Sequence, residues 1–182
     1  DLLSVSKVIR SGRIVQGEVV EKFENKVAKY IGVDGAVAMN TGTSALHLSL
    51  LAIGIKEGDY VAMPSFVCTA LLNAVRYVGA HPTLVDIDPE TYNIDIRDLK
   101  KRVKKSTKAI ILPHLFGLPA DIDEIVSLGI PVIEDCAQAI GAVYKGRKVG
   151  SFGKLSCFSF YATKVLSTGE GGMVVSDSKS LL

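Results

Sequence analysis

Short apolar segments recur along the chain and are separated by stretches of mixed polarity. Several of these segments are rich in Val, Ile and Ala and end at Pro, Asn or Asp, which is typical of strands buried in a sheet. The pattern predicts about seven strands, at 35–40, 60–63, 83–86, 108–113, 131–135, 155–159 and 172–176.

Between the predicted strands, apolar residues recur every three or four positions, as they do in helices that bury one face. The predicted helices cover 19–30, 43–53, 69–78, 96–104 and 122–128. Strands that alternate with helices favour a mostly parallel sheet covered on both faces. Only 160–171 joins the last two strands, so we expect one of them to run antiparallel or to join the sheet by another route. The predicted fold class is α/β with a mixed sheet.

The chain has 182 residues, enough for one α/β domain, with a helical segment at about 1–34 and an α/β core at about 35–182. A formal net charge of +2 gives no electrostatic footprint of nucleic-acid binding. The basic run 100–105 closes a predicted helix, where cations complement the helix dipole. No apolar run is long enough to cross a membrane. We therefore expect small molecules or proteins as partners.

Cysteine spacing and the chain ends bear on cellular setting. Cys68, Cys136 and Cys157 form neither a CxxC motif nor a zinc-type spacing, so no metal site is expected. No leader-like segment opens the sequence, and a cytoplasmic setting is predicted. The chain starts at Asp1 rather than at a methionine and stops within a polar turn, so we expect it to be a piece of a longer protein.

Ligands of open α/β sheets bind beyond the carboxyl ends of the strands, so the residues that follow each strand are the candidates for a site. The first strand is followed by Asn40-Thr41-Gly42-Thr43-Ser44. Gly42 permits close backbone approach, and Thr43 and Ser44 open a helix whose N–H groups and hydroxyls suit a phosphate. An ordinary helix-capping turn has the same composition, so both interpretations stay open.

Asp135 ends the apolar fifth strand, and Gln138 follows three residues later. A buried carboxylate is costly without a cationic partner, and a protonated heterocycle nitrogen would serve as one. An aspartate that caps the next helix explains the same position.

Lys164 follows the sixth strand, five residues after Ser159 and just before the glycine-rich run 169–172. A lysine amine held in a crevice is a candidate Schiff-base nucleophile, although a lone lysine is usually a solvated surface group. The conjunction of lysine, aspartate and phosphate-type turn at three strand ends favours a site. The segment 64–69 after the second strand is expected to form a further wall or to start a helix.

The glycine-rich run and the histidines also bear on function. The run 169–172 precedes a strand, whereas a nicotinamide-binding GxGxxG turn follows one, which disfavours a Rossmann dinucleotide site. Of the three histidines, His47 lies in an apolar helix and His81 in a turn, so only His114, at a strand end, is a candidate to line the site.

With these residues in view, the chain resembles the DegT/DnrJ/EryC1/StrS family of pyridoxal-phosphate (PLP) enzymes, best known as nucleotide-sugar aminotransferases. The resemblance covers essentially the whole chain in order. It is carried by SGRIVQG at 11–17, NTGTSAL at 40–46, VDID at 85–88, PHLFG at 113–117, EDCAQA at 134–139, GA at 141–142, FSF at 158–160 with Lys164, and GEGG at 169–172.

The resemblance implies roles for individual residues. Lys164 would hold PLP as a Schiff base, and Asp135 would partner the pyridine nitrogen. Gln138 would lie against the ring or its phenolic oxygen. The phosphate would be held by Thr43, Ser44 and Ser159, with the Gly42 backbone close by. Cys68 takes the position at which many relatives place an aromatic residue against the ring, so we leave the stacking contribution open and do not assign it to Phe66.

The resemblance further implies a fold-type I large domain without the C-terminal small domain, in a homodimer. The expected reaction transfers an amino group from a donor such as glutamate to a nucleotide-linked keto sugar, for aminosugar or polysaccharide biosynthesis. A family branch that dehydrates sugars has histidine in place of the lysine, so Lys164 favours transamination. Two alternatives remain open: an aminotransferase for a cyclitol or another cyclic ketone, and a non-catalytic regulatory relative.

Overall fold

One seven-stranded sheet organises the chain, and the computed structural model describes all residues 1–182. The strands lie in the spatial order β1-β9-β8-β5-β4-β2-β3. Only β9 runs against the others, since β1 and β8 both pair with it antiparallel and the remaining neighbours are parallel. The strands are β1 (Gly35–Met39), β2 (Tyr60–Pro64), β3 (His81–Val85), β4 (Thr107–Pro113), β5 (Val132–Asp135), β8 (Leu155–Ser159) and β9 (Gly172–Ser176).

The predicted sheet is confirmed, including the reversal at its end. The connection from β8 to β9 contains no helix, so β9 returns beside β8 in the opposite direction. Helix α1 (Leu2–Arg10) lies within the helical segment expected at about 1–34. Three features were not predicted: a small hairpin of β6 (Val143–Tyr144) and β7 (Arg147–Lys148), and the 3-10 turns η1 (Leu115–Gly117) and η2 (Lys179–Leu181). Each of these strands and turns is only two or three residues long, which is too short to show a periodic apolar pattern.

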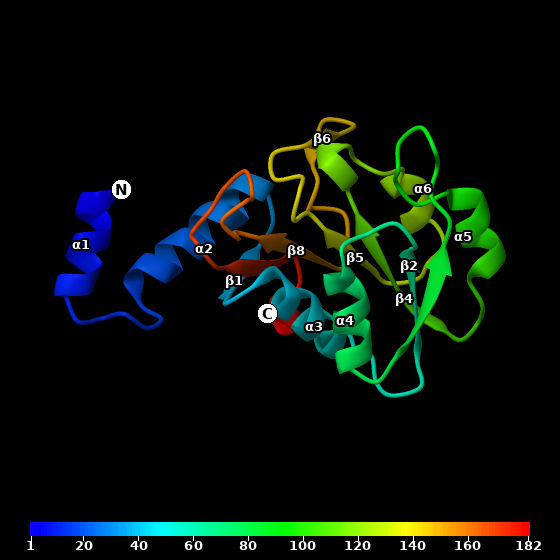
Figure 1. The fold of residues 1–182 in the computed structure, drawn as a ribbon, viewed down its shortest axis with the longest axis horizontal. Coiled ribbons are helices and arrows are strands. Elements are labelled where there is room, and N and C mark those ends of the chain that lie inside the picture. Colours follow the sequence, from blue (N-terminus) through cyan, green and yellow to red (C-terminus); the bar gives the residue numbers. More distant parts are fainter.

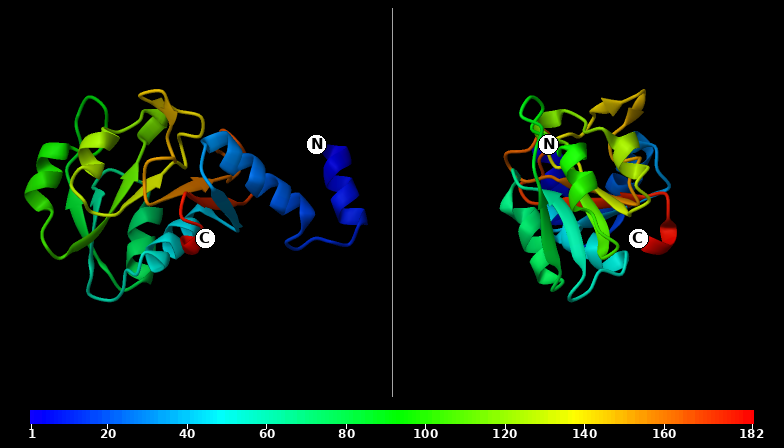
Figure 2. Two further views of the ribbon diagram at one scale, coloured as in Figure 1. Left: turned by 180° about the vertical axis from the view of Figure 1, so that it is seen from behind. Right: turned by 90° about the vertical axis from the view of Figure 1, so that its right-hand side faces the viewer.

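Helices cover both faces of the sheet, as Figures 1 and 2 show. The side chains of β4 alternate between the two layers: Ile110 and Leu112 join one hydrophobic cluster, and Ala109 and Ile111 join the other. The first cluster packs under α2 (Glu18–Ile31), α5 (Ile96–Arg102) and α6 (Ile122–Val126), and the second under α3 (Gly42–Ala52) and α4 (Thr69–Tyr77). Of the strands predicted from the sequence, β2, β4, β5, β8 and β9 are mostly buried, whereas β1 and β3, at the two edges of the sheet, are more exposed.

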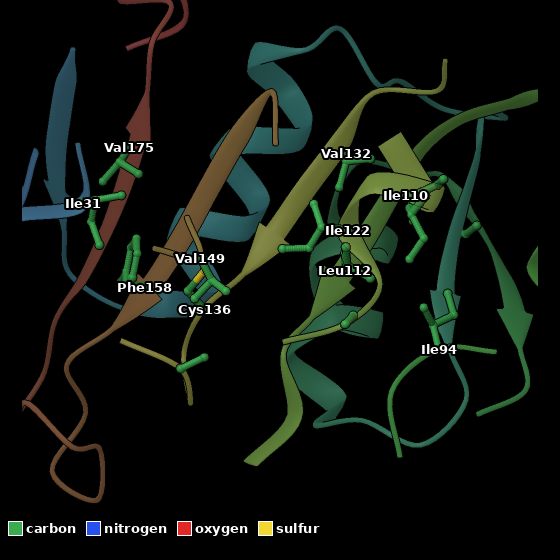
Figure 3. Close-up of a cluster of buried hydrophobic side chains, with 14 of the residues drawn as sticks. Ile31, Ile94, Ile110, Leu112, Ile122, Val132, Cys136, Val149, Phe158 and Val175 are labelled. Atoms are coloured by element: carbon green, nitrogen blue, oxygen red, sulfur yellow. The ribbon is translucent and has the colours of Figure 1, made fainter. Parts of the chain in front are cut away.

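Figure 3 shows the first cluster, in which side chains from α2, α6 and the central strands interdigitate. Phe158 of β8 and Leu112 of β4 are almost fully buried there. Burial of one such side chain contributes on the order of 1.5–3 kcal/mol. The central strands are therefore held firmly, and the loops at their carboxyl ends start from fixed positions.

Two glycines allow the start of α3, the end of β8 and the start of β9 to approach one another closely. A Cβ atom at Gly42 would lie 2.8 Å from the Cβ of Ser159, and one at Gly172 would overlap the carbonyl group of Thr41. The start of α3, the end of β8 and the start of β9 therefore pack directly on one another. This close approach brings the turn at 40–44 beside the segment that carries Lys164.

Helix α1 stands apart from the rest of the chain (Figure 1). It has no buried residue, and Leu2, Val5 and Ile9 are 80%, 56% and 62% exposed. Their spacing puts these three side chains on one side of the helix. None of the helices has the length and apolar character needed to span a membrane.

Candidate active site

A cavity of about 270 Å³ lies at the carboxyl ends of the central strands. Its walls come from the turn before α3, the start of α4, the ends of β4 and β5, and the connection between β8 and β9. It contains all but one of the residues predicted to bind a cofactor, namely Gly42, Thr43, Cys68, Asp135, Gln138, Ser159 and Lys164. Residues scattered over the sequence thus face one space.

Ser44 is the predicted residue that does not line the cavity. Thr41 caps α3, and its Oγ1 accepts a hydrogen bond of 3.0 Å from the Ser44 backbone N–H. The Thr41 hydroxyl also donates to Ser44 Oγ at 3.0 Å. The Ser44 side chain therefore belongs to the cap. Gly42 and Thr43, at the first two helical positions, offer backbone N–H groups that have no partner within the helix, and such groups bind anions.

Asp135 ends β5 with its side chain on the α3–α4 side of the sheet, the side that bears the cavity. Oδ1 accepts one hydrogen bond, from the Ala137 backbone N–H at 3.0 Å, and Oδ2 has no partner in the chain. Burial raises the pKa of Asp135 above its usual value, because the single N–H compensates only in part. A cationic group in the cavity would restore the balance.

Glu134 precedes Asp135 on the same strand, and its side chain points to the opposite face, where it is completely buried. It accepts five hydrogen bonds of 2.6–3.1 Å, from the backbone N–H groups of Gly150, Phe152 and Gly153, the Ser156 hydroxyl and the His114 ring. Burial alone would raise the pKa of Glu134, but these bonds hold it below its usual value. Glu134 is satisfied within the fold and Asp135 is not.

His114 links the two sides of the site, because it lines the cavity and also contacts Glu134. Its Nδ1 accepts the Ala120 backbone N–H at 3.2 Å, so the ring proton is assigned to Nε2, which donates to Glu134 Oε2 at 3.0 Å. This pair is a hydrogen bond between a neutral ring and a carboxylate.

His114, Glu134 and Cys136 bring their ligand atoms within 4.8 Å of one another. Both ring nitrogens and both carboxylate oxygens are already engaged in hydrogen bonds. Burial raises the pKa of the Cys136 thiol well above its usual value, which disfavours the thiolate that a metal would bind. This cluster supports the fold rather than a metal ion.

Gln138 and Cys68 each belong to a wall of the cavity. The Gln138 side chain accepts the Phe116 backbone N–H through Oε1 at 2.9 Å, which fixes its orientation. Cys68 is the residue before α4 and carries a free thiol. Phe66 does not line the cavity, so neither wall presents an aromatic ring from this segment.

Some lining residues were not singled out by the sequence. Tyr161 and Glu170 flank Lys164 in the connection between β8 and β9, and their closeness to the predicted lysine was a usable signal. Leu46 and Leu71 come from the buried sides of α3 and α4. No sequence pattern distinguishes such residues from ordinary core, because only the packing of the two helices brings them to the cavity.

The donor set fits PLP in three respects. Helix N–H groups with the Thr43 and Ser159 hydroxyls suit its phosphate, the partnerless oxygen of Asp135 suits a protonated ring nitrogen, and the Lys164 amine suits its aldehyde. The Lys164 ammonium forms no hydrogen bond or ion pair with the chain, which leaves it available to a ligand. An anion site, a carboxylate and an amine that line one cavity are together characteristic of a PLP site.

The chain matches the DegT/DnrJ/EryC1/StrS aminotransferase family over residues 1–182, and it belongs to that family. It is 47% identical over 170 residues to the GDP-perosamine synthase of Escherichia coli O157:H7, a match that covers 91% of this chain and 47% of the relative. The sequence resemblance to the family is confirmed.

Solved structures agree with this assignment. The crystal structure of S. venezuelae DesV in complex with a ketimine intermediate matches with a TM-score of 0.94 and 38% identity, over 98% of this chain and 50% of that one. E. coli GDP-4-keto-6-deoxy-D-mannose-3-dehydratase with bound hydrated PLP matches with a TM-score of 0.94 and 32% identity, over 99% and 49%. The chain spans about half the length of the relatives it matches.

Replacing Glu134 with Gln tests the buried network. The amide cannot accept all five hydrogen bonds, and its NH₂ group would face donors, so we expect unfolding at pH 7 to cost about 3 kcal/mol less. The folded pKa of Glu134 is lowered, so its contribution is present above the usual value of 4.5 and is lost as pH falls. Urea unfolding should therefore show the same difference between the two proteins at pH 7 and pH 5, and a smaller difference at pH 4.

The exposed Glu57 provides a matched control, since Glu57→Gln changes the same group without removing buried bonds. A Glu134→Gln penalty that stayed constant from pH 7 to pH 4 would contradict the assigned role of the ionised carboxylate.

Proposed function

We propose that the protein is a PLP-dependent aminotransferase that transfers an amino group from an amino-acid donor, glutamate, to a nucleotide-linked keto sugar for aminosugar or polysaccharide biosynthesis. The observation that carries this proposal is the convergence of Lys164, Asp135 and the amino end of α3 in one cavity. Family membership and the similarity to GDP-perosamine synthase support the reaction and the substrate class.

Each lining residue has a role that its position supports. The N–H groups of Gly42 and Thr43 and the hydroxyls of Thr43 and Ser159 would bind the phosphate. Asp135 would hold a proton on the ring nitrogen through its uncompensated charge. Gln138 would lie beside the ring, with its amide fixed by the Phe116 N–H.

PLP, when bound, supplies an electron sink that stabilises the carbanion formed when an amino acid loses its α-proton. Lys164 Nζ would hold the cofactor covalently and, when released by the substrate amine, would accept and return that proton. Its place on the connection after β8, beside the partly exposed Tyr161, gives the side chain freedom to move between these tasks.

Lysine at position 164 favours transamination over the dehydration for which the E. coli relative is named, since the resemblance places histidine there in dehydratases. A non-catalytic relative would have no need for a buried carboxylate without a partner. Asp135 has that character, because burial raises its pKa, and its single hydrogen bond and the nearby Lys164 charge offset that cost only in part. The catalytic interpretation therefore accounts for a feature that folding alone leaves unexplained.

We further propose that the protein works as a homodimer in the cytoplasm. The side of α1 that carries Leu2, Val5 and Ile9 has no cover within the chain, and such a face is characteristic of a subunit contact. The three cysteines are all free thiols, which fits a reducing compartment.

The covalent role of Lys164 predicts a specific label. Borohydride reduction of the PLP-loaded full-length protein should fix the pyridoxyl group on the peptide that contains Lys164, as read by mass spectrometry. Lys164→Arg should abolish the label, whereas Lys154→Arg, on the segment before β8, should leave it intact. A pyridoxyl group found on another lysine would overturn the assignment.

The substitution Asp135→Asn removes the negative charge and keeps the shape of the side chain. We expect the variant to bind PLP but to lose transaminase activity by several orders of magnitude, because the ring nitrogen is no longer kept protonated. Steady-state kinetics with glutamate and cofactor absorbance would measure the two effects separately. Asp34→Asn, at an exposed aspartate, is the control, and near-normal turnover in Asp135→Asn would refute the role.

The dimer proposal predicts that the full-length protein sediments as a dimer. Ile9→Glu puts a charge on the apolar side of α1 and should shift the population toward monomer, whereas Lys7→Glu on the same helix should not. Analytical ultracentrifugation over a concentration series gives the dissociation constants. A monomeric wild type would show the proposal to be wrong.

A further inference from the structure

Three aromatic side chains from separate loops meet beside the cavity. Phe66 follows β2, Tyr92 follows β3, and Phe116 lies in η1 after β4. The ring centroids of Phe66 and Tyr92 are 5.7 Å apart, and those of Tyr92 and Phe116 are 6.2 Å apart. The three residues remain 50%, 45% and 70% exposed. We call this surface the aromatic platform.

The platform is held in a conformation that costs energy. Tyr92 and Phe116 have φ angles of 60° and 54°, and Lys145 is the only other non-glycine residue with positive φ. Such a conformation costs on the order of 1–3 kcal/mol per residue and persists where the surroundings enforce it. Two of the three strained residues are thus aromatic and in contact with each other, although neither ring is buried in the core.

A buried amide enforces this geometry. Asn93 is only 4% exposed, and its Oδ1 accepts the Leu115 backbone N–H at 3.0 Å while its Nδ2 donates to the Leu118 carbonyl at 3.0 Å. These bonds clamp the turn that carries Phe116 against the loop that carries Tyr92. The platform is therefore a built surface rather than a chance meeting of mobile side chains.

The platform is continuous with the cofactor cavity. The Phe116 backbone N–H donates to Gln138, a lining residue, and the neighbours of the platform rings in sequence, Val67 and Leu115, line the cavity as well. A cavity of about 270 Å³ lies at the lower limit of ligand pockets, so a cofactor leaves little room for more than the reacting part of a substrate. The remainder of a large substrate must extend over the rim.

We propose that the aromatic platform stacks the nucleobase of the nucleotide-linked sugar. The inference rests on the proposed function and assigns the base-binding part of the substrate site to Phe66, Tyr92 and Phe116. Exposed rings bind bases through their π faces, and this stacking is worth enough per base to affect affinity while tolerating different bases. The strain at Tyr92 and Phe116 is thereby explained as a cost that ligand binding offsets.

The test uses substitutions that remove a ring and suit the backbone. Asparagine tolerates positive φ, so Tyr92→Asn and Phe116→Asn should fold, with thermal stability equal to or above that of the wild type. Each should raise the Kd of the full-length, PLP-loaded protein for GDP and for UDP about tenfold, as measured by calorimetry. Tyr92→Phe, which keeps the ring, should retain the wild-type affinity.

Lys145→Asn is the matched control, because it relieves the third positive φ without removing an aromatic ring. Its Kd for both nucleotides should not change. An unchanged Kd in Tyr92→Asn and Phe116→Asn would overturn the proposal. So would a shift toward monomer in sedimentation with unchanged affinity, since the platform would then be a subunit contact.

The wild-type half-reaction with glutamate needs no nucleotide and tests the proposed function separately. If glutamate converts the cofactor but neither GDP nor UDP binds, the platform assignment is wrong and the aminotransferase function stands. If glutamate does not convert the cofactor, the proposed function itself fails.

Discussion

The site depends on the opposite orientation of two adjacent carboxylates at the end of β5. Because successive side chains of a strand face opposite sides, Glu134 and Asp135 enter different environments. Glu134 receives five hydrogen bonds and ties the segment 150–153, β8 and His114 to the central strand. Asp135 receives one and keeps a free oxygen at the cavity. The Glu134 carboxylate stabilises the fold. The Asp135 carboxylate is buried with only partial compensation, so a bound cation would stabilise its charged form.

The reversal of β9 brings the amine of Lys164 into the same cavity as Asp135. A parallel crossover after β8 would have needed a helix and would have carried Lys164 away from the sheet edge. The short connection instead turns back at once, and Gly42 and Gly172 let the helix α3 and strand β9 close on Ser159 and Thr41. Anion-binding turn, carboxylate and amine are thereby assembled by backbone packing rather than by long flexible side chains.

The site and the aromatic platform show the same relation between stability and function. Asp135 is buried with incomplete compensation, and Tyr92 and Phe116 hold positive φ angles. Each feature lowers the stability of the free protein, and under the proposals above each is offset when a ligand of the right chemistry binds. The rest of the structure, with two well-filled hydrophobic layers, carries enough stability to hold them.

The sequence by itself determined the elements and the candidate chemistry. The seven strands, the five core helices and the positions of Asp135, Lys164 and the turn at 40–44 follow from apolar periodicity and strand-end polarity, because these are local properties of the chain. Family motifs added the cofactor and the reaction class.

Only the tertiary structure decided which neighbours these residues have. It engaged Ser44 in the cap of α3, satisfied Glu134 while leaving Asp135 free, and brought Phe66, Tyr92 and Phe116 together from three loops. Hydrogen-bond partners and ring contacts depend on segments distant in sequence, and local pattern carries no information about them. The sequence therefore could not predict that Glu134 would be fully hydrogen-bonded within the fold while Asp135 would face the cavity.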